Sequence, residues 1–391
     1  MTDTYILSAA RTPMGGFQGE LSGLTAPQLG SAAIKAALAR AKLTGADVGE
    51  VLMGNVLPAG LGQAPARQAG IGAAIPDSVP ATTISKVCGS GMKAIMIAED
   101  AIRAGHAEIV VAGGMESMTN SPYLLPKARG GFRMGHAEVK DHMFLDGLED
   151  AYEGRLMGTY GDEAARAYQL TRDDQDAYAM ESLARAKRAV GDGSFTAEIV
   201  PVTVKTRAGE VEISADEQPG KADPKKIPNL KPAFAKDGTV TAATSASISD
   251  GAAALVIAGA AAADKRGLSP IARIVGQAAY AGKPGLFTSA PVYAIQRLFE
   301  KTGWTAKDVD LFEINEAFAN VAMIAMKEHG LSHDIVNVNG GACALGHPIG
   351  ASGARIVVTL INALKARGLK RGVASLCIGG GEATALAVEL V

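Results

Sequence analysis

Residues 86–105 read KVCGSGMKAIMIAEDAIRAG, and residues 346–368 read GHPIGASGARIVVTLINALKARG. In each stretch, small residues form a tight turn that opens an apolar helix ending in glycine. An apolar segment that ends in glycines follows each helix, VVAGG at 110–114 and VASLCIGGG at 373–381. Such a segment is typical of a buried strand. The repeated order of turn, helix and strand predicts an α/β fold built by internal duplication.

The overall composition also favours an α/β protein. The chain has 391 residues, of which 48% are hydrophobic, so we expect two or three packed units. Glycine is frequent, with 47 residues, and aromatic residues are scarce, at 5%. This balance suits many tight turns between strands and helices. A further helix is expected over residues 28–43, where apolar residues recur at helical spacing.

The charge balance points to a ligand in a pocket. The net charge is -2, and no block of like charges indicates a nucleic-acid or membrane partner. We expect no transmembrane segment, because no run approaches the ~18 apolar residues that span a bilayer. Residues 1–13 lack the basic and apolar regions of a secretion signal. Three cysteines, an odd number in a long chain, argue against a disulfide framework and predict a reducing, cytoplasmic location.

The middle of the chain, from about residue 117 to residue 247, differs from both flanking parts. It is richer in charge and proline, as in DEQPGKADPKKIPNLKPAF at 216–234. One helix is expected within it, over 172–190, with acidic residues first and basic residues last, as the helix dipole favours. The small residues of 245–259 then return the chain to the core. The middle part is therefore predicted to be an inserted domain.

Cys88 is the leading candidate for a nucleophile. The duplication places Cys88 and His347 at equivalent helix N-termini, which could meet at one cleft. Unpaired N–H groups at such an end lower the pKa of a thiol and increase its thiolate fraction. The flanking glycines also leave backbone N–H groups free to form an oxyanion hole. The alternative is that Cys88 is a small buried residue of the core, and the flanking glycines argue against this interpretation.

Three other residues are candidates for the same chemistry. His347 lies in a rigid turn before a proline, which suits a general base, whereas the remaining five histidines lie in ordinary polar contexts. Cys377, at a strand end before three glycines, is either a proton-transferring thiol or a core residue. Asn315 follows an apolar run and is either a polar group that holds a water or carbonyl oxygen, or a helix N-cap. Cys343 is assigned to packing.

Several other functional templates are absent from the sequence. There is no GxxxxGK[ST] phosphate loop and no HExxH motif, and the cysteines and histidines lack the spacing of zinc ligands. The glycine runs do not match the GxGxxG pattern of a dinucleotide site. We therefore expect neither a metal nor a redox cofactor.

Four motifs in this order resemble those of the thiolase family: KVCGSGMKA around Cys88, Asn315-Glu316-Ala317-Phe318, GGACALGHPIGASG around His347, and CIGGG around Cys377. The resemblance extends from AARTPMGGF near the start through PKARGGFRMGH at 126–136 to the last strand, and is closest to the branch that joins two acetyl-CoA molecules. It implies two βαβαβαββ halves that form a five-layer αβαβα core. The implied domains are 1–119 with 248–270, an inserted loop domain at 120–247 for CoA binding and oligomer contacts, and 271–391.

The resemblance also implies a two-cysteine mechanism. Cys88 takes an acyl group from acyl-CoA, with His347 as the base, and Cys377 then removes a proton from the methyl group of a second thioester. The resulting carbanion attacks the acyl-Cys88 thioester in a reversible Claisen condensation. The backbone N–H groups of Cys88 and Gly379 would stabilise one oxyanion, and His347 with a water on Asn315 would stabilise the enolate. Coenzyme A enters as part of the substrates, so no separate cofactor is implied.

The CoA-binding positions are carried over from the same resemblance. Leu156 replaces a family histidine, Ala246 replaces a family serine between Ser245 and Ser247, and Gly220 replaces a family arginine. Lys221, Lys225 and Lys226 lie close enough in sequence to supply charge for the CoA phosphates. Without the resemblance, Phe234 and Phe318 are equally well explained as aromatic residues of the core. The implied substrate-binding residues are Met157, Lys221, Phe234, Ala246, Ser247 and Phe318.

The resemblance leaves three alternatives to a short-chain condensing enzyme of fatty acid metabolism. One is a degradative 3-ketoacyl-CoA thiolase for longer chains, and a second is a condensing enzyme for carrier-protein thioesters, which usually has two catalytic histidines. The third is a non-catalytic acyl-CoA binder, which would need a damaged site. The family also implies a homotetramer or dimer, with the loop around residues 120–145 contributing to assembly.

Overall fold

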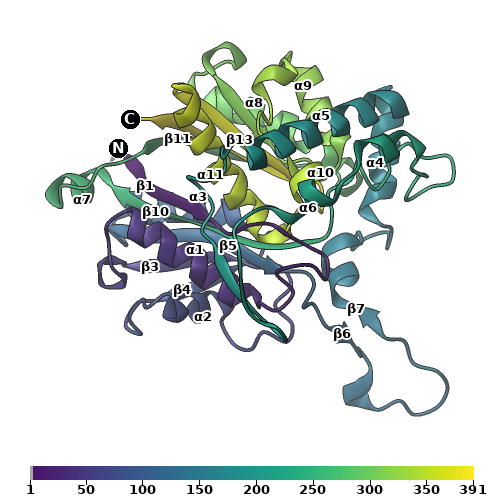
Figure 1. Ribbon diagram of the computed structural model, residues 1–391, viewed down its shortest axis with the longest axis horizontal. Coiled ribbons are helices and arrows are strands. Elements are labelled where there is room, and N and C mark those ends of the chain that lie inside the picture. Colours follow the sequence, from purple (N-terminus) through teal and green to yellow (C-terminus); the bar gives the residue numbers. More distant parts are fainter. Residues whose placement is uncertain (1–2) are drawn as a thin grey trace.

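A computed structural model describes residues 3–391 and shows two halves, each of a sheet with helices (Figure 1). Residues 1–13 were compared above with a secretion signal, and the first two of them, Met1 and Thr2, lie outside the described residues. The strand order is β4-β3-β5-β10-β1 in the N-terminal half and β11-β14-β13-β12 in the C-terminal half. The edge strands β1 and β11 pair over Thr4–Ile6, so backbone hydrogen bonds connect the two halves.

The N-terminal half has the predicted βαβαβαββ order. Strand β3 pairs in parallel with β4 and β5, whereas β10 pairs antiparallel with β5 and β1. The helix expected over 28–43 is present as α1, shifted by two or three residues at its ends. The elements are β1 (Thr4–Arg11), α1 (Ala26–Arg40), β3 (Glu50–Gly54), α2 (Pro65–Gly72), β4 (Ala81–Ile84), α3 (Ser90–Arg103), β5 (Ile109–Ser117) and β10 (Ser249–Gly259).

The C-terminal half repeats this order, with one strand reduced to a single bridge between Val336 and Phe312. The reason is local: the side-chain amide of Asn337 accepts from the backbone N–H of Ile314 and donates to its carbonyl, at 2.8 Å each, where a neighbouring strand would bond. Apart from this strand the predicted duplication is confirmed. The elements are β11 (Ala272–Ala281), α8 (Ala290–Thr302), β12 (Leu311–Ile314), α9 (Ala319–His329), α11 (Ile349–Arg367), β13 (Arg371–Ile378) and β14 (Glu382–Leu390).

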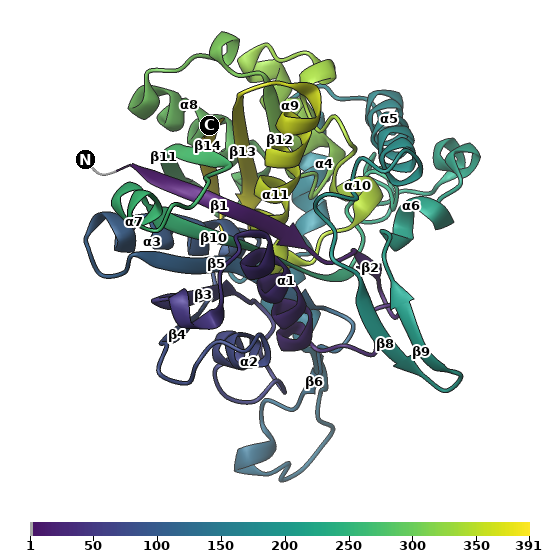
Figure 2. The same cartoon turned by 60° about the vertical axis from the view of Figure 1, so that its left-hand side comes forward.

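The helices and sheets form the expected five layers. Helices α3 and α11 lie between the strands of the two halves and share one apolar core with β5 and β13 (Figure 2). Helices α1 and α2 cover the outer face of the N-terminal sheet, and α8 and α9 cover that of the C-terminal sheet. A helix between two sheets must be apolar on all sides, which explains the composition of α11.

Helix α11 corrects one expectation from the sequence. Within the described residues it is the single helix whose length of 19 residues and mean hydropathy of 1.2 would suffice to cross a membrane, although no such run was expected. In its most apolar window, 83% of the residues are buried inside the protein, as in the core helix of a soluble fold. It begins at Ile349, five residues before the apolar run at Ala354, because the small residues of the turn already adopt helical geometry.

Glycines allow the N-termini of α3 and α11 to approach closely. The carbonyl oxygen of Gly350 would lie 2.0 Å from a Cβ at Gly114, 2.8 Å from one at Gly54 and 3.1 Å from one at Gly91. Any side chain at Gly114 would therefore push the first turn of α11 away from β5. This approach places the residues that precede α3 and α11, Cys88 and His347, on the same side of the core.

The middle of the chain packs over both halves. Helix α5 (Arg172–Gly191) matches the helix expected over 172–190, and Thr171 and Asp174 form a capping box at its start. Leu183 and Phe195 share a cluster with Leu345 of the C-terminal half. Helix α4 (Met157–Ala167) was not expected from the sequence. The remaining helices and strands are α6 (Glu217–Lys221), α7 (Ala260–Lys265), α10 (Ala342–Leu345), β2 (Gly15–Gly16), β6 (Tyr123–Leu124), β7 (Lys140–Asp141), β8 (Val202–Thr206) and β9 (Gly209–Ile213).

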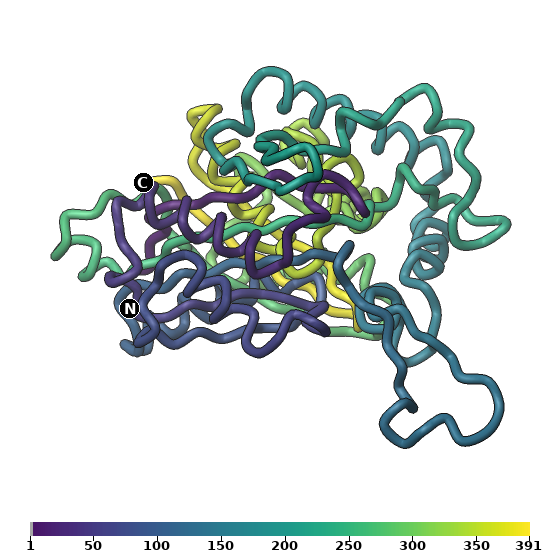
Figure 3. Tube along the Cα trace, turned by 60° about the horizontal axis from the view of Figure 1, so that its bottom comes forward, coloured from purple at the N-terminus to yellow at the C-terminus, as the bar shows by residue number. Residues whose placement is uncertain are grey.

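One loop of this middle part projects from the body of the molecule. It includes the short pair β6–β7 and extends away from both sheets (Figures 1 and 3). Met134 at its tip is 98% exposed. Short helical turns complete the structure: η1 (Gly45–Asp47), η2 (Ala128–Gly130), the π-helical η3 (Phe144–Leu148), η4 (Pro224–Asn229), η5 (Pro284–Ser289), η6 (Ala306–Asp308) and η7 (His333–Ile335).

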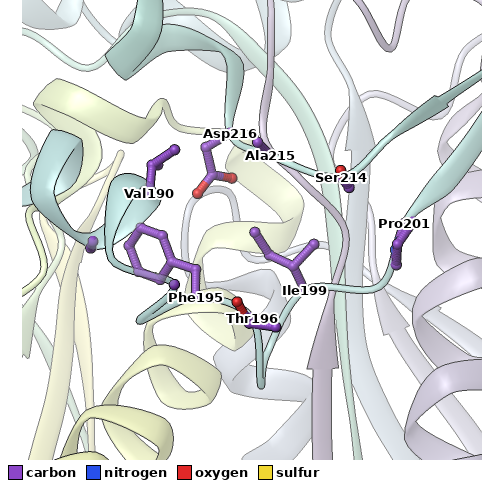
Figure 4. Close-up of a pocket in the computed structure, with 10 residues that line it drawn as sticks. Val190, Phe195, Thr196, Ile199, Pro201, Ser214, Ala215 and Asp216 are labelled. Carbon is purple, nitrogen blue, oxygen red and sulfur yellow. The ribbon is translucent and has the colours of Figure 1, made fainter.

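A buried ion-pair group fixes the middle part to β1. The guanidinium of Arg11 binds Asp216 through two hydrogen bonds of 2.6 and 2.8 Å and contacts Glu198 at 2.5 Å. Figure 4 shows Asp216 among the residues that line a cavity in this region, together with Phe195 and Val190. Removing one partner of such a buried group typically costs ~3–5 kcal/mol, so the contact strongly constrains how the middle part docks.

Candidate active site

One cavity of about 390 Å³ brings together most of the residues predicted to act in the reaction. It lies where the loops before α3 and α11 meet the ends of β13 and the start of α4. All the predicted site residues line it except Asn315 and Lys221. Its lining residues that matter below are Cys88, His347, Cys377, Gly379, Phe144, Leu148, Leu156, Met157, Phe234, Ala246, Ser247, Phe287 and Phe318.

Cys88 is presented to the cavity by a strained turn. Val87, directly before it, has a φ of 44°, a region that a β-branched residue rarely adopts. The hydroxyl of Ser90 accepts a hydrogen bond from the backbone N–H of Lys86 at 2.8 Å and donates to the carbonyl of Val87 at 2.7 Å. These two bonds hold the turn closed, so that Cys88 lies two residues before α3 as the sequence predicts.

The expected increase in thiolate at Cys88 is wrong for the free protein. Burial raises the pKa of the Cys88 thiol to about 11, although hydrogen bonds from the backbone N–H groups of Gly379 and Cys88 lower it. Desolvation of a thiolate therefore outweighs the favourable field of the helix N-terminus. The thiol is neutral near pH 7 and needs a base when it reacts.

Two backbone donors near the Cys88 sulfur are the groups predicted to form the oxyanion hole. The backbone N–H groups of Gly379 and Cys88, from opposite halves of the chain, both lower the pKa of the Cys88 thiol. Gly380 and Gly381, with φ values of 93° and 82°, allow the chain to turn sharply after Gly379. Donors fixed in this way can bind the negative oxygen that forms when a thioester on Cys88 is attacked.

His347 has the geometry of a general base. Its Nδ1 lies 2.6 Å from the hydroxyl oxygen of Ser352, which itself donates to the carbonyl of Pro348. Nδ1 must therefore be the protonated nitrogen, and Nε2 is left as the acceptor. Among residues 3–391, Nε2 is buried without a hydrogen-bond partner. Burial, with the nearby charge of Arg355, lowers the pKa of His347 to about 3, so the ring is neutral in the free protein and is a weaker base than an ordinary histidine.

Cys377 is a core residue that also lines the cavity, so its proton-transferring role stays a prediction. It is 1% exposed and packs with Tyr160, Phe287 and Phe318, yet its side chain also lines the cavity. Burial, with the neighbouring charge of Cys88, raises its pKa well above the ordinary value. A thiolate formed here would be a strong base.

Asn315 is 1% exposed and does not line the cavity. It directly follows β12, but the N-cap of α9 is Phe318, so the N-cap interpretation is wrong. Its Oδ1 lies 3.5 Å from a guanidinium nitrogen of the buried Arg355. Its Nδ2 is buried and makes no hydrogen bond within the described part of the chain. Within the described residues, the amide therefore has a donor that is free to bind a water.

The predicted acyl-binding residues form the apolar wall of the cavity. Phe234 and Phe318 pack edge to face, with ring centroids 5.9 Å apart, and belong to a cluster with Met157 and Cys377. Their roles as core aromatics and as lining residues therefore coincide. Ala246 donates its backbone N–H to Ala317, and the backbone N–H of His347 bonds to the carbonyl of Ser247 at 3.1 Å.

Lys221 is not part of the cavity. Its ammonium pairs with the carboxylate of Glu217 on the same helix, α6, and its side chain is 60% exposed. Gly220, where the family has an arginine, faces open space, with no atom within 4 Å of a Cβ placed there. The structure therefore supplies no contact between this lysine and the reacting groups.

Several residues that support the site were not predicted from the sequence. Glu116 and Glu316 are buried carboxyl groups that each accept four hydrogen bonds, Ser352 orients His347, and Arg355 lies beside Asn315. Cys343, assigned to packing, indeed packs against the outer C-terminal core, and its thiol lies 3.6 Å from the carbonyl of Glu316. In the sequence, the one available sign of Glu116 and Glu316 is that each is an acidic residue near the end of an apolar run.

Another correction concerns His142, which the sequence placed in an ordinary polar context. It is 4% exposed, and its Nδ1 lies 2.6 Å from the carboxylate of Asp146. Among the described residues, no group of three or more His, Cys, Asp or Glu side chains is placed to hold a metal ion.

Comparisons with known proteins agree with this geometry. The family model of the thiolase N-terminal domain matches residues 4–261, and that of the thiolase C-terminal domain matches residues 268–390. An acetyl-CoA acetyltransferase of Cupriavidus necator is 51% identical over the whole of both chains, and one of Escherichia coli is 48% identical over 100% of this chain and 99% of the other. The crystal structure of the Bacillus anthracis acetyl-CoA acetyltransferase superposes with a TM-score of 0.97 at 41% identity, covering 100% of this chain and 99% of that one.

Proposed function

The chain belongs to the thiolase family, and we propose that it is an acetyl-CoA C-acetyltransferase, which converts two acetyl-CoA into acetoacetyl-CoA and free CoA. The observation that supports this best is the meeting of Cys88, His347, Cys377 and the Gly379 N–H at one cavity. These groups come from both halves of the duplicated fold. Together they supply a nucleophile, two bases and an oxyanion hole.

The first half-reaction transfers an acetyl group to Cys88. The sulfur attacks the thioester carbonyl of acetyl-CoA while its proton passes to Nε2 of His347. The carbonyl oxygen becomes negative and is held by the N–H groups of Gly379 and Cys88. When the tetrahedral intermediate collapses, the C–S bond to CoA breaks, and Cys377 gives its proton to the departing CoA thiolate, so that a Cys377 thiolate and a protonated His347 remain. Acetyl-Cys88 and free CoA result.

The second half-reaction forms the carbon–carbon bond. The thiolate of Cys377 removes a proton from the methyl group of a second acetyl-CoA, and the enolate oxygen accepts hydrogen bonds from the protonated Nε2 of His347 and from a water held by Asn315. The carbanion attacks the carbonyl of acetyl-Cys88, and the Cys88 sulfur leaves as the thiolate. Acetoacetyl-CoA is released, and His347 returns its proton to the Cys88 thiolate, which restores the starting protein. Thiolysis is the same sequence in reverse.

One observation favours a second candidate, a thiolase for longer 3-ketoacyl-CoA substrates. Leu156 lines the cavity at a position where short-chain members of the family have a histidine. This part of the cavity wall is therefore more apolar in the present chain. Against this, the bulky side chains of Leu148, Phe234 and Phe287 line the same cavity as Cys88 and Cys377. These bulky side chains support the short-chain assignment.

The chain-length profile tests the choice between the two. Thiolysis of acetoacetyl-CoA and 3-ketohexadecanoyl-CoA by the purified protein should be measured under the same conditions. We expect kcat/KM to be higher for acetoacetyl-CoA. A preference for the long substrate would replace the proposed function with the degradative one.

We also propose that the protein is a cytoplasmic homotetramer of fatty acid metabolism that needs no cofactor besides the CoA of its substrates. The projecting loop supports assembly, because Tyr123, Phe132 and Met134 are exposed apolar residues at 68%, 47% and 98%. The three free thiols support a reducing compartment. Light scattering on the purified protein should give the mass of four chains, and a monomer would contradict the assembly.

A further inference from the structure

Glu116 is a buried carboxyl group that no step above uses. It lies at the end of β5, is 0% exposed and does not line the cavity. Its Oε1 accepts hydrogen bonds from the side-chain amide of Asn55 at 2.7 Å and from the backbone N–H of Leu57 at 3.2 Å. Its Oε2 accepts from the backbone N–H groups of Val56 and Gly350, at 2.9 Å each.

These donors belong to the two segments that flank the reacting groups. Residues 55–57 follow β3, whereas Gly350 lies in the first turn of α11, three residues after His347. Val56, Leu57 and Ile349 share one apolar cluster against which Cys88 packs. One carboxylate therefore links a loop beside the nucleophile to the helix start that presents the base.

The hydrogen bond between Gly350 and Glu116 leaves no room for a side chain at position 350. A Cβ at Gly350 would lie 2.5 Å from Oε2 of Glu116, so a side chain there would prevent the hydrogen bond. The carbonyl of Gly350 is in turn enclosed by Gly54, Gly91 and Gly114. The first turn of α11 is thus held from two sides, by the glycines at its carbonyl and by Glu116 at its N–H.

The carboxylate is also costly to bury. Burial raises the pKa of Glu116 to about 7 despite three backbone donors that lower it. An apolar side chain at this position would avoid that cost but would leave four buried donors without an acceptor. Filling space therefore does not explain a carboxylate at this position, whereas holding three backbone N–H groups in a fixed arrangement does.

We propose that Glu116 is a positioning residue for the reaction: it fixes the first turn of α11, and with it His347, relative to the loop that packs against Cys88. This role rests on the proposed function. Glu116 acts through the placement of His347 and does not contact the substrate.

The substitution Glu116→Gln tests this role. Glutamine has nearly the same size but one acceptor oxygen, so its NH2 group must face the donors of either Gly350 and Val56 or Leu57 and Asn55. We expect the rate of Cys88 acetylation by radioactive acetyl-CoA to fall about 100-fold, as a displacement of roughly 1 Å in a catalytic group can cause. KM should stay within about twofold, because Glu116 does not line the cavity.

Glu99→Gln provides the matched control. Glu99 is a buried carboxyl on α3 that bonds to Arg103 and Gln277, and burial raises its pKa as well. It does not line the cavity. We expect E99Q to be acetylated at the rate of the unmutated chain, and an equal loss in E99Q and E116Q would overturn the specific role of Glu116.

A second readout separates positioning from general damage. Alkylation of Cys88 by iodoacetamide at about pH 9 depends on the thiolate, and the charge of Glu116 raises the pKa of Cys88. E116Q should therefore be alkylated at least as fast as the unmutated chain while it is acetylated more slowly. Slower alkylation, in parallel with slower acetylation, would overturn the proposal.

Two further outcomes are decisive. If E116Q does not fold, Glu116→Asp keeps the charge but is too short to reach both segments, and we expect a loss of about tenfold, because roughly one hydrogen bond is removed. A folded E116Q or E116D that is acetylated normally would overturn the role of Glu116 alone. An unmutated chain that is not acetylated at Cys88 would overturn both this proposal and the proposed function.

Discussion

The hydroxyl oxygen of Ser352 lies 2.6 Å from Nδ1 of His347 and thereby decides which ring nitrogen can act as the base. In Ser352→Ala this acceptor is lost, and the imidazole can rotate or change tautomer. We expect the rate of Cys88 acetylation to fall about fivefold, the factor that corresponds to one hydrogen bond of ~1 kcal/mol. Stopped-flow measurement of CoA release in a single turnover checks this.

Ser31→Ala is the control for this substitution. Ser31 bonds to the carbonyls of Pro27 and Ala69 in the outer helix layer, so S31A loses a hydroxyl of the same kind away from the cavity. S31A should retain the full rate. Equal rates for S352A and the unmutated chain would show that packing alone orients His347.

The two cysteines should separate the half-reactions. Cys88→Ala is expected to abolish condensation and thiolysis, whereas Cys377→Ala should still take an acetyl group on Cys88 but lose condensation. Radioactive acetyl-CoA followed by gel filtration measures bound acetyl per chain. Full labelling of C88A would contradict the mechanism.

The sequence predicted those parts of the site that depend on local chain chemistry. Cys88, His347 and Cys377 stand next to glycine-rich turns, and such turns mark element ends whatever the rest of the chain does. The same reasoning placed both central helices to within a few residues. Residues whose role depends on a distant partner were missed, as for Glu116, whose donor Gly350 lies 234 positions away.

The pKa of Cys88 was predicted with the wrong sign for a related reason. The helix N-terminus is a local feature, visible in the sequence, and it stabilises a thiolate. The opposing desolvation comes from Val56, Leu57 and Ile349, which the fold brings together from two halves. Burial can therefore be judged only once the tertiary packing is known. The helix α4 was missed because two of its first five residues, Gly158 and Gly161, are poor helix formers.

The raised pKa of Cys88 leads to a direct spectroscopic prediction. A thiol with a pKa of about 11 stays protonated below that value, and His347, with a pKa of about 3, stays neutral above its own. No thiolate–imidazolium pair should therefore exist in the free protein between about pH 5 and pH 9. The difference in ultraviolet thiolate absorbance between the unmutated chain and C88A should stay near zero over this range and rise near pH 11. A rise near pH 5 would instead show a preformed ion pair.

Gly158 and Gly161, on the same helix α4, provide a matched pair for testing the acyl wall. A Cβ at Gly158 would lie 2.3 Å from the ring of Phe234, whereas one at Gly161 would meet its neighbours at 3.5 Å or more. Because an aromatic ring cannot fold out of the way, Gly158→Ala must displace Phe234, which lines the cavity, and such overpacking costs ~1–3 kcal/mol. We expect kcat/KM for acetoacetyl-CoA thiolysis to fall about tenfold in G158A.

Gly161→Ala should leave kcat/KM within about twofold and raise the free energy of unfolding by ~0.5–1 kcal/mol, since alanine suits a helix interior better than glycine. Unchanged kinetics in G158A would mean that Phe234 does not shape the site where the acyl group binds.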